Sequence, residues 1–356
     1  MRQLFIRYKS SIAKFLQAYL VSEAGKLQKI NPLAADAIRR MLESSLRGKM
    51  VRGSLILFAT ELNGKKITLD TLRAAAALEI FHTGLLAQDD VMDRDRLRRG
   101  MKTLYAQYGD WAKARGCKDA LHVGESLATC AADAAFFLGF ELLSSLKVLP
   151  TSLIGTYARE LALVAGAQMQ DVYFGAVDRV PAVREILEVY RYKTARYTFS
   201  LPFRIGGLLA GSNSRTIKQL EELGEHLGLI FQLKDDELGL YGTEKEIGKP
   251  VGSDLREGKK TLYYCFLFKR ATPQEKKRLQ NIFGRPAASG IPLRREKLEI
   301  KFVHSLIAKY GISAEIEKFL EKEVKRARGI IGQIRVAAKY KKILNEILEY
   351  NLRRTG

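Results

Sequence analysis

Residues 71–93 read TLRAAAALEIFHTGLLAQDDVMD. Residues 71–88 are rich in Ala and Leu, which are strong helix formers, so they predict a long apolar helix that ends in three aspartates. Residues i and i+4 lie on one face of a helix, so we expect Asp89 and Asp93 to point the same way. Carboxylates at that spacing repel each other unless a cation lies between them, and Mg²⁺ prefers oxygen ligands. Alone, the motif is also typical of an ordinary acidic helix end.

A second aspartate pair has the same setting. Residues 231–239 read FQLKDDELG, with Asp235 and Asp236 at the end of an apolar stretch that begins near Leu220. A glycine-rich segment with Lys249 and Lys259 follows. Lysines on a loop beside a carboxylate metal site would neutralise a departing diphosphate, and a closing loop would exclude water.

Basic residues accompany both aspartate clusters. Arg98-Arg99-Gly100 follows Asp93, and guanidinium groups match phosphate oxygens. Gly48-Lys49-x-x-Arg52 offers a second anion pocket, and Lys193-Thr194 lies in the helix predicted after Pro181. Paired acidic clusters with basic neighbours therefore predict a site for a diphosphate.

Helical patterns dominate the chain, and strand patterns are scarce. Asn31-Pro32 predicts a helix start, and long apolar helices are expected over residues 121–146 and 151–174. Helices that are apolar on more than one face belong in the middle of a bundle. We therefore expect an all-α protein with one large helical domain over residues 1–356.

The composition limits the remaining classes. The apolar fraction is 47% and the charged fraction 28%, which excludes bulk disorder. The net charge of +21 would suit nucleic acid, but the basic residues are interleaved with acids and form no dense run, so no nucleic-acid partner is expected. A solvated basic surface remains open, as does peripheral contact of the basic C-terminal third, from Thr272, with an anionic membrane.

Localisation is predicted from three sequence features. The sequence has no run of 18 or more apolar residues, so no membrane span is predicted. Residues 1–9 do not resemble a signal peptide. Cys117, Cys130 and Cys265 are far apart and show no metal or disulfide spacing, which favours the reducing cytoplasm.

Taken together, the motifs resemble those of the trans-isoprenyl diphosphate synthases, the polyprenyl synthetase family. The matching elements, in the family's order, are Gly48-Lys49-x-x-Arg52, Glu79-x-x-His82, Asp89-Asp90-x-x-Asp93, Arg98-Arg99-Gly100, Asp133, Gln168-x-x-Asp171, Lys193-Thr194, Phe231-Gln232-x-x-Asp235-Asp236, Gly248-Lys249, and Asp254 followed by Lys259. The resemblance implies a helical bundle of the isoprenoid synthase type with a central cavity, working as a homodimer. It also implies a Mg²⁺-dependent condensation of isopentenyl diphosphate with an allylic diphosphate.

The resemblance also implies a role for each matching residue. Three Mg²⁺ ions would be held by Asp89, Asp93 and Asp235, supported by Asp90, Asp236 and Asp171. The allylic diphosphate would contact Arg98, Lys193, Lys249 and Lys259, with Thr194 and Gln232 near the carbocation. Isopentenyl diphosphate would bind Lys49, Arg52, His82 and Arg99. Without the surrounding motif, His82 would be interpreted as an ordinary helix histidine.

One position departs from the family's pattern, because Gly239 stands where the second cluster usually has a third aspartate. A weakly active or non-catalytic subunit of a heteromeric synthase therefore remains an alternative. A class I terpene cyclase is a further alternative, but it would not need a second diphosphate pocket and would normally carry an Asn/Ser/Glu metal triad.

Product length in this family depends on bulk along the helix that precedes the first cluster. Gly84 and Leu85, five and four residues before Asp89, leave that space open. Phe81 lies one turn deeper and is the candidate floor of the cavity, with Leu78 behind it and Phe136 or Phe137 as candidates from a neighbouring helix. Phe81 could equally pack only in the core. The expected product is C20 or longer, with C20–C25 favoured.

Overall fold

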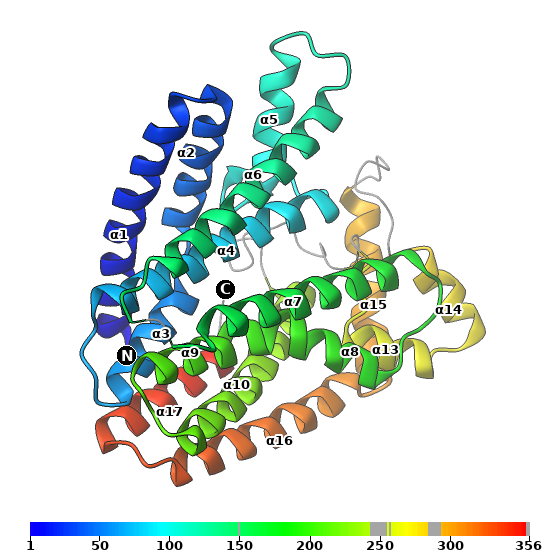
Figure 1. The fold of residues 1–356 in the computed structure, drawn as a ribbon. Coiled ribbons are helices and arrows are strands. Elements are labelled where there is room, and N and C mark those ends of the chain that lie inside the picture. The colour runs from blue at the N-terminus through cyan, green and yellow to red at the C-terminus, as the bar shows by residue number, and fades with distance from the viewer. Residues whose placement is uncertain (149, 243–254, 256–257, 284–292, 354–356) are drawn as a thin grey trace. The chain divides into compact units, whose positions relative to one another are not determined.

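The computed structural model describes residues 1–148, 150–242, 255, 258–283 and 293–353. The chain is almost wholly helical, which confirms the all-α prediction. Within these residues the strands are β1 (Leu97–Arg98) and β2 (Met101–Lys102), a minimal antiparallel pair. The chain divides into two compact units (Figure 1): unit 1 is Met1–Ala158 with Leu201–Leu220, and unit 2 is Arg159–Ser200 with Glu221–Gly356.

Unit 1 contains the helices that carry the first aspartate cluster. They are α1 (Arg2–Gln28), α2 (Pro32–Arg47), α3 (Val51–Leu62), α4 (Leu69–Met92), α5 (Leu104–Lys113), α6 (Ala120–Ser144) and α9 (Leu201–Leu209). Asn31 starts α2 as predicted, since its side chain accepts the Leu33 N–H at 2.9 Å. Thr68 starts α4 in the same way, through the Thr71 N–H.

The core of unit 1 is built around α4. Residues 74–78 and Phe81 of this helix are essentially inaccessible, as expected for a helix in the middle of a bundle. Helices α3 and α6 pack against α4, and α9 packs against α3. A Cβ at Gly206 would lie 2.5 Å from the Ala59 Cβ, so the close approach of α9 to α3 requires glycine.

Helix α6 is also apolar, and it is long and apolar enough to cross a membrane by length and composition alone. It packs against α4 and α5 in unit 1. Two large apolar side chains of α6 are open to solvent, since Phe137 is 74% exposed and Leu121, near the start of the helix, 53% exposed.

Unit 2 carries the second aspartate cluster. Its helices are α7 (Leu153–Ala176) and α10 (Ser214–Tyr241), both of which begin in unit 1, then α8 (Val183–Val189), the π-helix η1 (Tyr190–Ser200), α13 (Leu262–Arg270), α14 (Pro273–Gln280), α15 (Leu293–Lys309), α16 (Ile312–Gln333) and α17 (Ala338–Leu352). Residues 262–268 of α13 are buried on every side, and α8, α15 and α16 pack around this helix.

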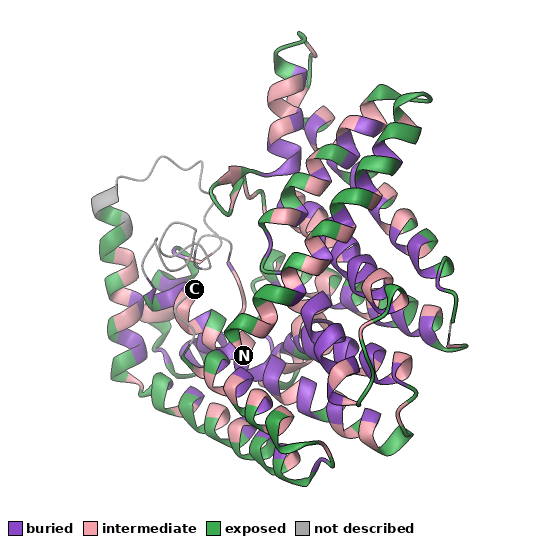
Figure 2. Ribbon diagram, turned by 90° about the vertical axis from the view of Figure 1, so that its left-hand side faces the viewer, coloured by how far each residue is buried: buried purple, intermediate pink, exposed green. Residues whose placement is uncertain are grey.

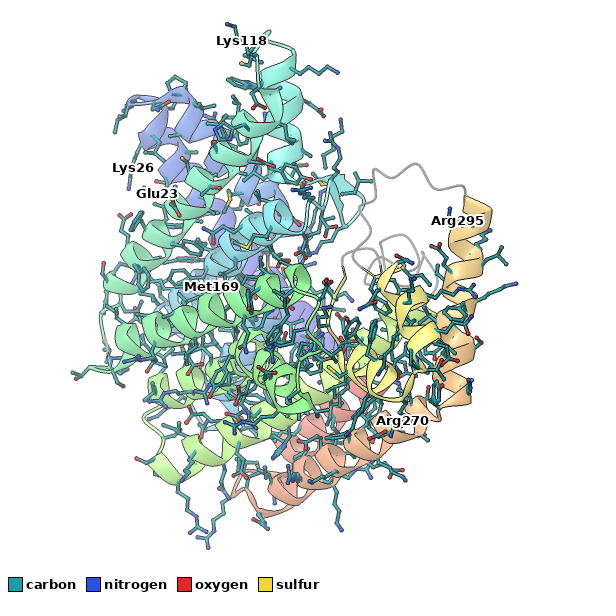
Figure 3. All side chains as sticks on the ribbon, turned by 90° about the vertical axis from the view of Figure 1, so that its right-hand side faces the viewer. Glu23, Lys26, Lys118, Met169, Arg270 and Arg295 are labelled. Atoms are coloured by element: carbon teal, nitrogen blue, oxygen red, sulfur yellow. The ribbon has the colours of Figure 1, made fainter. Side chains whose placement is uncertain are left out.

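Along the surface helices, buried residues alternate with exposed ones (Figure 2). The termini of unit 2 helices are held by ion pairs such as that of Arg270, labelled in Figure 3, with Glu315. On α7, Met169 is 74% exposed and points outward (Figure 3).

The helix expected after Pro181 departs from regular α geometry. It is α-helical to Val189 and continues as a π-helix from Tyr190. Such π segments are rare and occur often at functional sites. Arg196 holds the segment in place by pairing with Glu160 and, at 2.7 Å, with Glu225. A Cβ at Gly228 would lie 2.2 Å from the Ala195 Cα, so α10 and η1 touch along their backbones.

Candidate active site

The first aspartate cluster lies at the end of α4. Asp89 and Asp93 are partly accessible, whereas Asp90 is only 5% exposed. The Asp93 N–H donates to the Asp89 carbonyl at 2.8 Å and closes the last helical turn. Asp89 and Asp93 therefore lie one turn apart, as the spacing predicts, while Asp90 points into the protein.

Arg98 binds the carboxylates of this cluster. Its Nε donates to Asp90 Oδ1 at 2.5 Å, and its Nη2 donates to Asp89 Oδ2 at 3.2 Å. Burial raises the pKa of Asp90 to about 6, although Arg98 opposes the shift. Burial would lower the pKa of Arg98, but the Asp90 and Asp89 carboxylates outweigh it and raise that pKa. Arg98 thus lies where a diphosphate bound at the first cluster would meet a fixed positive charge.

The residues predicted for the second substrate also come together in unit 1. Arg52 Nη1 lies 3.0 Å from His82 Nε2. Burial, and then the charges of Arg52 and Arg99, hold the pKa of His82 well below its usual range, so the ring is neutral. The Glu79 carboxylate accepts the Gly53 N–H at 2.7 Å and so anchors the start of α3 beside His82.

Backbone strain marks this pocket. Met50, Arg94 and Arg99 are non-glycine residues with φ of 50°, 57° and 54°. Left-handed conformations are uncommon for such residues and cluster at functional sites. Each of the three is next to, or is, a residue predicted to bind substrate or metal. A Cβ at Gly48 would lie 3.0 Å from Arg99 Nη1, so the glycine of the Gly48-Lys49 motif leaves room for the Arg99 guanidinium.

A pocket in unit 1 adds two arginines that the sequence interpretation missed. It is lined by Asp90, Arg98 and Arg99 and also by Arg40 and Arg47 of α2. Arg40 donates to Asp36 and Gln107, and Arg47 pairs with Glu43 at 3.3 Å. Arg40 belongs to no quoted motif, whereas Arg47 directly precedes Gly48-Lys49, so its neighbourhood to a basic motif was visible in the sequence; that both border the first cluster is revealed by the fold.

The second aspartate cluster lies near the end of α10, in unit 2. Asp235 is exposed and Asp236 only 4% exposed. Gln232 Nε2 donates to Asp236 Oδ1 at 2.9 Å, and the Thr194 hydroxyl donates to Gln232 Oε1 at 2.8 Å. The two predicted dipolar residues, Thr194 and Gln232, are therefore directly bonded to each other beside the cluster.

The structure describes two of the three predicted lysines of unit 2, Lys193 and Lys259. Lys193 Nζ donates to Asp171 Oδ2 at 2.6 Å, which joins η1 to α7. Lys259 borders a small cavity formed by α10, α13 and α15, with Leu240 and Tyr263 among its walls. Lys249 and Asp254 lie outside the described residues.

The carboxylates can be tested for their fit to Mg²⁺. Within the described ranges, no three His, Cys, Asp or Glu side chains form a group that could hold a metal by themselves. Each cluster instead offers one or two accessible carboxylates, in unit 1 from Asp89 and Asp93 and in unit 2 from Asp235. This is the donor set of Mg²⁺, which binds one or two carboxylates and completes its shell with water and substrate phosphate.

The predicted chain-length residues face α6. Phe81 is fully buried, and its ring lies 4.9 Å from that of Phe140, between ring centroids. A Cβ at Gly139 would lie 2.5 Å from the Phe81 ring, so this glycine makes room for the ring. A Cβ at Gly84 would lie 3.1 Å from Phe136 Cε1. The expectation that Gly84 leaves this space open is therefore wrong, because α6 packs closely against Gly84 through Phe136, whereas Phe137 faces solvent.

Comparison with known proteins agrees with this geometry. The polyprenyl synthetase family model matches residues 35–291. Over 97% of the chain and 96% of the relative, the sequence is 32% identical to a geranylgeranyl diphosphate synthase of Sulfolobus acidocaldarius. Over 86% of the chain and 90% of the relative, it is 33% identical to a geranylfarnesyl diphosphate synthase of Aeropyrum pernix. The chain belongs to the polyprenyl synthetase family.

Solved structures share the fold. A geranylgeranyl pyrophosphate synthase of Corynebacterium glutamicum, solved with isoprenyl diphosphate and magnesium, superposes with a TM-score of 0.87 at 23% identity, covering 98% of this chain and 99% of that one. A geranylgeranyl pyrophosphate synthetase of Pyrococcus horikoshii superposes with a TM-score of 0.79 at 25% identity, covering 99% of each chain. Members of this family are prenyl diphosphate synthases, and the chain is accordingly a transferase of prenyl groups.

Proposed function

We propose that the protein condenses isopentenyl diphosphate with an allylic diphosphate to give an all-trans product of C20–C25. The observation that carries the proposal is the different surroundings, in unit 1, of two adjacent arginines. Arg98 faces the carboxylates of the first cluster, whereas Arg99 lies with Arg52 and His82. Two adjacent arginines thus serve two separate groups, as a reaction between two diphosphates requires.

The allylic diphosphate is proposed to bind between the two aspartate clusters. We propose that units 1 and 2 act together as one isoprenoid synthase domain. The binding residues are Asp89, Asp93, Asp235 and Arg98, with Lys193, Lys249 and Lys259. When bound, Mg²⁺, for which we propose three ions, neutralises the charge that develops on the diphosphate as it leaves.

The reaction then follows from the substrates. The allylic carbon–oxygen bond breaks, and diphosphate leaves with the bonding electrons. The double bond of isopentenyl diphosphate attacks the cation, and loss of a proton to the released diphosphate restores a double bond. Thr194 and Gln232 direct oxygen dipoles near the cation, while Arg98 and the lysines hold the leaving group.

Isopentenyl diphosphate is proposed to bind Lys49, Arg52, His82 and Arg99. His82 suits this role because it is neutral and its Nε2 faces Arg52, so the guanidinium stays oriented without an added positive charge. The strained backbone at Met50 and Arg99 indicates that the fold sets these side chains at a cost in local stability.

Product length is proposed to be set between α4 and α6. Gly84 lets α6 approach α4 closely at Phe136, and the Phe81 ring lies one turn deeper, packed against Phe140. Leu85, on the same helix, is partly accessible and would line the wall above Phe81.

We further propose a homodimer that forms through α6. Phe137 leaves a large apolar ring exposed on this helix, and aromatic side chains are enriched in the buried part of interfaces. The enzyme is proposed to act in the cytoplasm, with its basic C-terminal helices in peripheral contact with anionic membrane lipids.

One specific observation supports the alternative of a weakly active or non-catalytic subunit, which is Gly239 in place of a third aspartate.

The proposed function is tested by incubating the protein and Mg²⁺ with isopentenyl diphosphate and, in turn, dimethylallyl, geranyl, farnesyl and geranylgeranyl diphosphate. Chain-length analysis of the products should give C20 or C25. No elongation from any primer, under conditions in which the protein is folded, would favour the subunit.

A further inference from the structure

Tyr190 is the first residue of η1, and its side chain lies under the second aspartate cluster. It is 6% exposed and sits in the apolar core of unit 2 with Leu233, Leu240 and Leu262. A buried phenol in such surroundings needs hydrogen-bond partners for its hydroxyl. No family motif draws attention to Tyr190.

Both hydrogen-bonding functions of this hydroxyl are used. The Tyr190 hydroxyl donates to Asp236 Oδ2, and it accepts the Leu262 N–H at 3.0 Å. Leu262 opens α13, directly after Thr261 and close to Lys259. The phenol therefore joins the second cluster to the segment that carries a proposed substrate-binding lysine.

Asp236 is held from two sides by this arrangement. Tyr190 binds Oδ2, and Gln232 donates to Oδ1 at 2.9 Å. Gln232 in turn accepts from Thr194 at 2.8 Å. One continuous chain of hydrogen bonds thus runs from the start of α13 through the carboxylate to the two proposed dipolar residues.

The presence of Gly239 makes these hydrogen bonds to Asp236 more important. In the first cluster Asp93 lies four residues after Asp89 and shares its helical face. In the second cluster the residue four positions after Asp235 is Gly239, which is buried and has no carboxylate. Asp235 is then the accessible donor of the second cluster and the buried Asp236 supports it, so the orientation of Asp236 matters more than it would beside a third aspartate.

We propose that Tyr190 is a positioning residue, which fixes Asp236 so that the incomplete second cluster can take up Mg²⁺ and keeps Gln232 and Thr194 aligned with it. The inference rests on the proposed function and deepens it. Groups that orient metal ligands typically contribute about 10–100-fold to metal affinity or activity. Tyr190 acts through Asp236 and makes no contact with substrate itself.

The test is the Mg²⁺ dependence of elongation by the wild type and by Tyr190→Phe, which keeps the ring and removes only the hydroxyl. The wild type is measured first, because absence of any elongation would contradict the proposed function and not the role of Tyr190. In Tyr190→Phe, the Mg²⁺ concentration for half-maximal rate should rise roughly tenfold or more. A residue with a merely structural role would lower the amount of active protein without moving this concentration.

Tyr108→Phe is the matched control. The Tyr108 hydroxyl also donates to a carboxylate, Asp36 Oδ2 at 3.1 Å, and is 1% exposed. This variant should keep the wild-type Mg²⁺ dependence. An equal shift in both variants would overturn the proposal, as would an unchanged Mg²⁺ dependence in Tyr190→Phe.

A double-mutant cycle on the Kd of Mg²⁺, measured by calorimetry in the presence of inorganic diphosphate and without turnover, gives the second readout. If Tyr190 acts through Asp236, Tyr190→Phe should add little to the shift that Asp236→Asn causes, because coupled residues are not additive. Fully additive shifts would contradict the proposal. Failure of Tyr190→Phe to fold would contradict it too, since a hydroxyl whose role is positioning is dispensable for folding.

Discussion

The guanidinium of Arg98 bridges two neighbouring carboxylates, with Nε 2.5 Å from Asp90 Oδ1 and Nη2 3.2 Å from Asp89 Oδ2. Asp90 is buried, whereas Asp89 is accessible. The buried contact fixes the arginine, and the accessible contact leaves part of its fork at the substrate. We propose that Arg98 is thereby preorganised for the charge that an allylic diphosphate would bring.

Arg98→Ala should therefore lower kcat/KM for the allylic primer by about 10–100-fold, the loss expected for a hydrogen bond to a charged group of roughly 1.5–3 kcal/mol. Steady-state kinetics with the primer varied would measure the effect. Arg96→Ala is the control, because Arg96 is 60% exposed and pairs with Asp110 at 3.6 Å. Similar losses in the two variants would refute a specific role for Arg98.

Phe81→Ala should lengthen the product, because it removes the ring that fills the space between α4 and α6 beside Gly139. Product analysis by mass spectrometry would detect the change. Phe58→Ala is the control: Phe58 is equally buried, on α3, and both substitutions should cost about 3–5 kcal/mol of stability. Unchanged product length in Phe81→Ala would assign Phe81 to core packing alone.

Phe137→Glu should weaken the proposed homodimer, since it replaces an exposed aromatic ring of α6 by a charge. Light scattering of the purified variant should show a smaller mass than that of the wild type. Met169→Glu, at a position with the same 74% exposure on α7, is the comparison. Equal masses for wild type and Phe137→Glu would exclude the α6 face as the interface.

Acid stability should depend on Glu323, which binds His226 Nδ1 at 2.6 Å and Arg326 at 3.1 Å. Burial alone would raise the pKa of Glu323, but the hydrogen bond and charge of His226 outweigh burial and lower it below the ordinary 4.5. A depressed carboxyl pKa stabilises the fold above about pH 4.5, and this contribution is lost as the pH falls through the folded-state value.

Glu323→Gln should therefore unfold more easily than the wild type at neutral pH, and the difference should shrink as the pH falls below 4.5. Urea unfolding at neutral and at acidic pH would measure both. The exposed Glu321→Gln, on the same helix, should match the wild type throughout. A difference in unfolding free energy that does not change with pH would contradict this role of the Glu323 carboxylate.

The sequence predicted the helices because their apolar periodicity is local. The composition of α4 and the Asn31 cap of α2 required no tertiary information. The aspartate clusters were found for the same reason, since spacing along a helix determines which carboxylates share a face. The resemblance to a family added the roles of isolated residues such as His82.

Contacts between distant segments could not be predicted from one sequence. The link of Tyr190 to Asp236 joins residues far apart in the chain, and the π-helix that places Tyr190 depends on Glu160 and Glu225. The close approach of Gly139 to Phe81 is likewise tertiary. Periodicity also could not show that α16 ends at Gln333, where the buried Ile334 is extended, and that α17 starts only at Ala338.

The claim that both aspartate clusters grip one diphosphate is tested most directly by a double-mutant cycle on kcat with Asp89→Asn and Asp235→Asn. Groups that act as a unit are grossly non-additive. Each single variant should lose at least roughly a hundredfold in kcat, and the double variant should be little worse than the poorer single variant. Losses that multiply, or an Asp235→Asn variant with wild-type kcat, would contradict a shared grip.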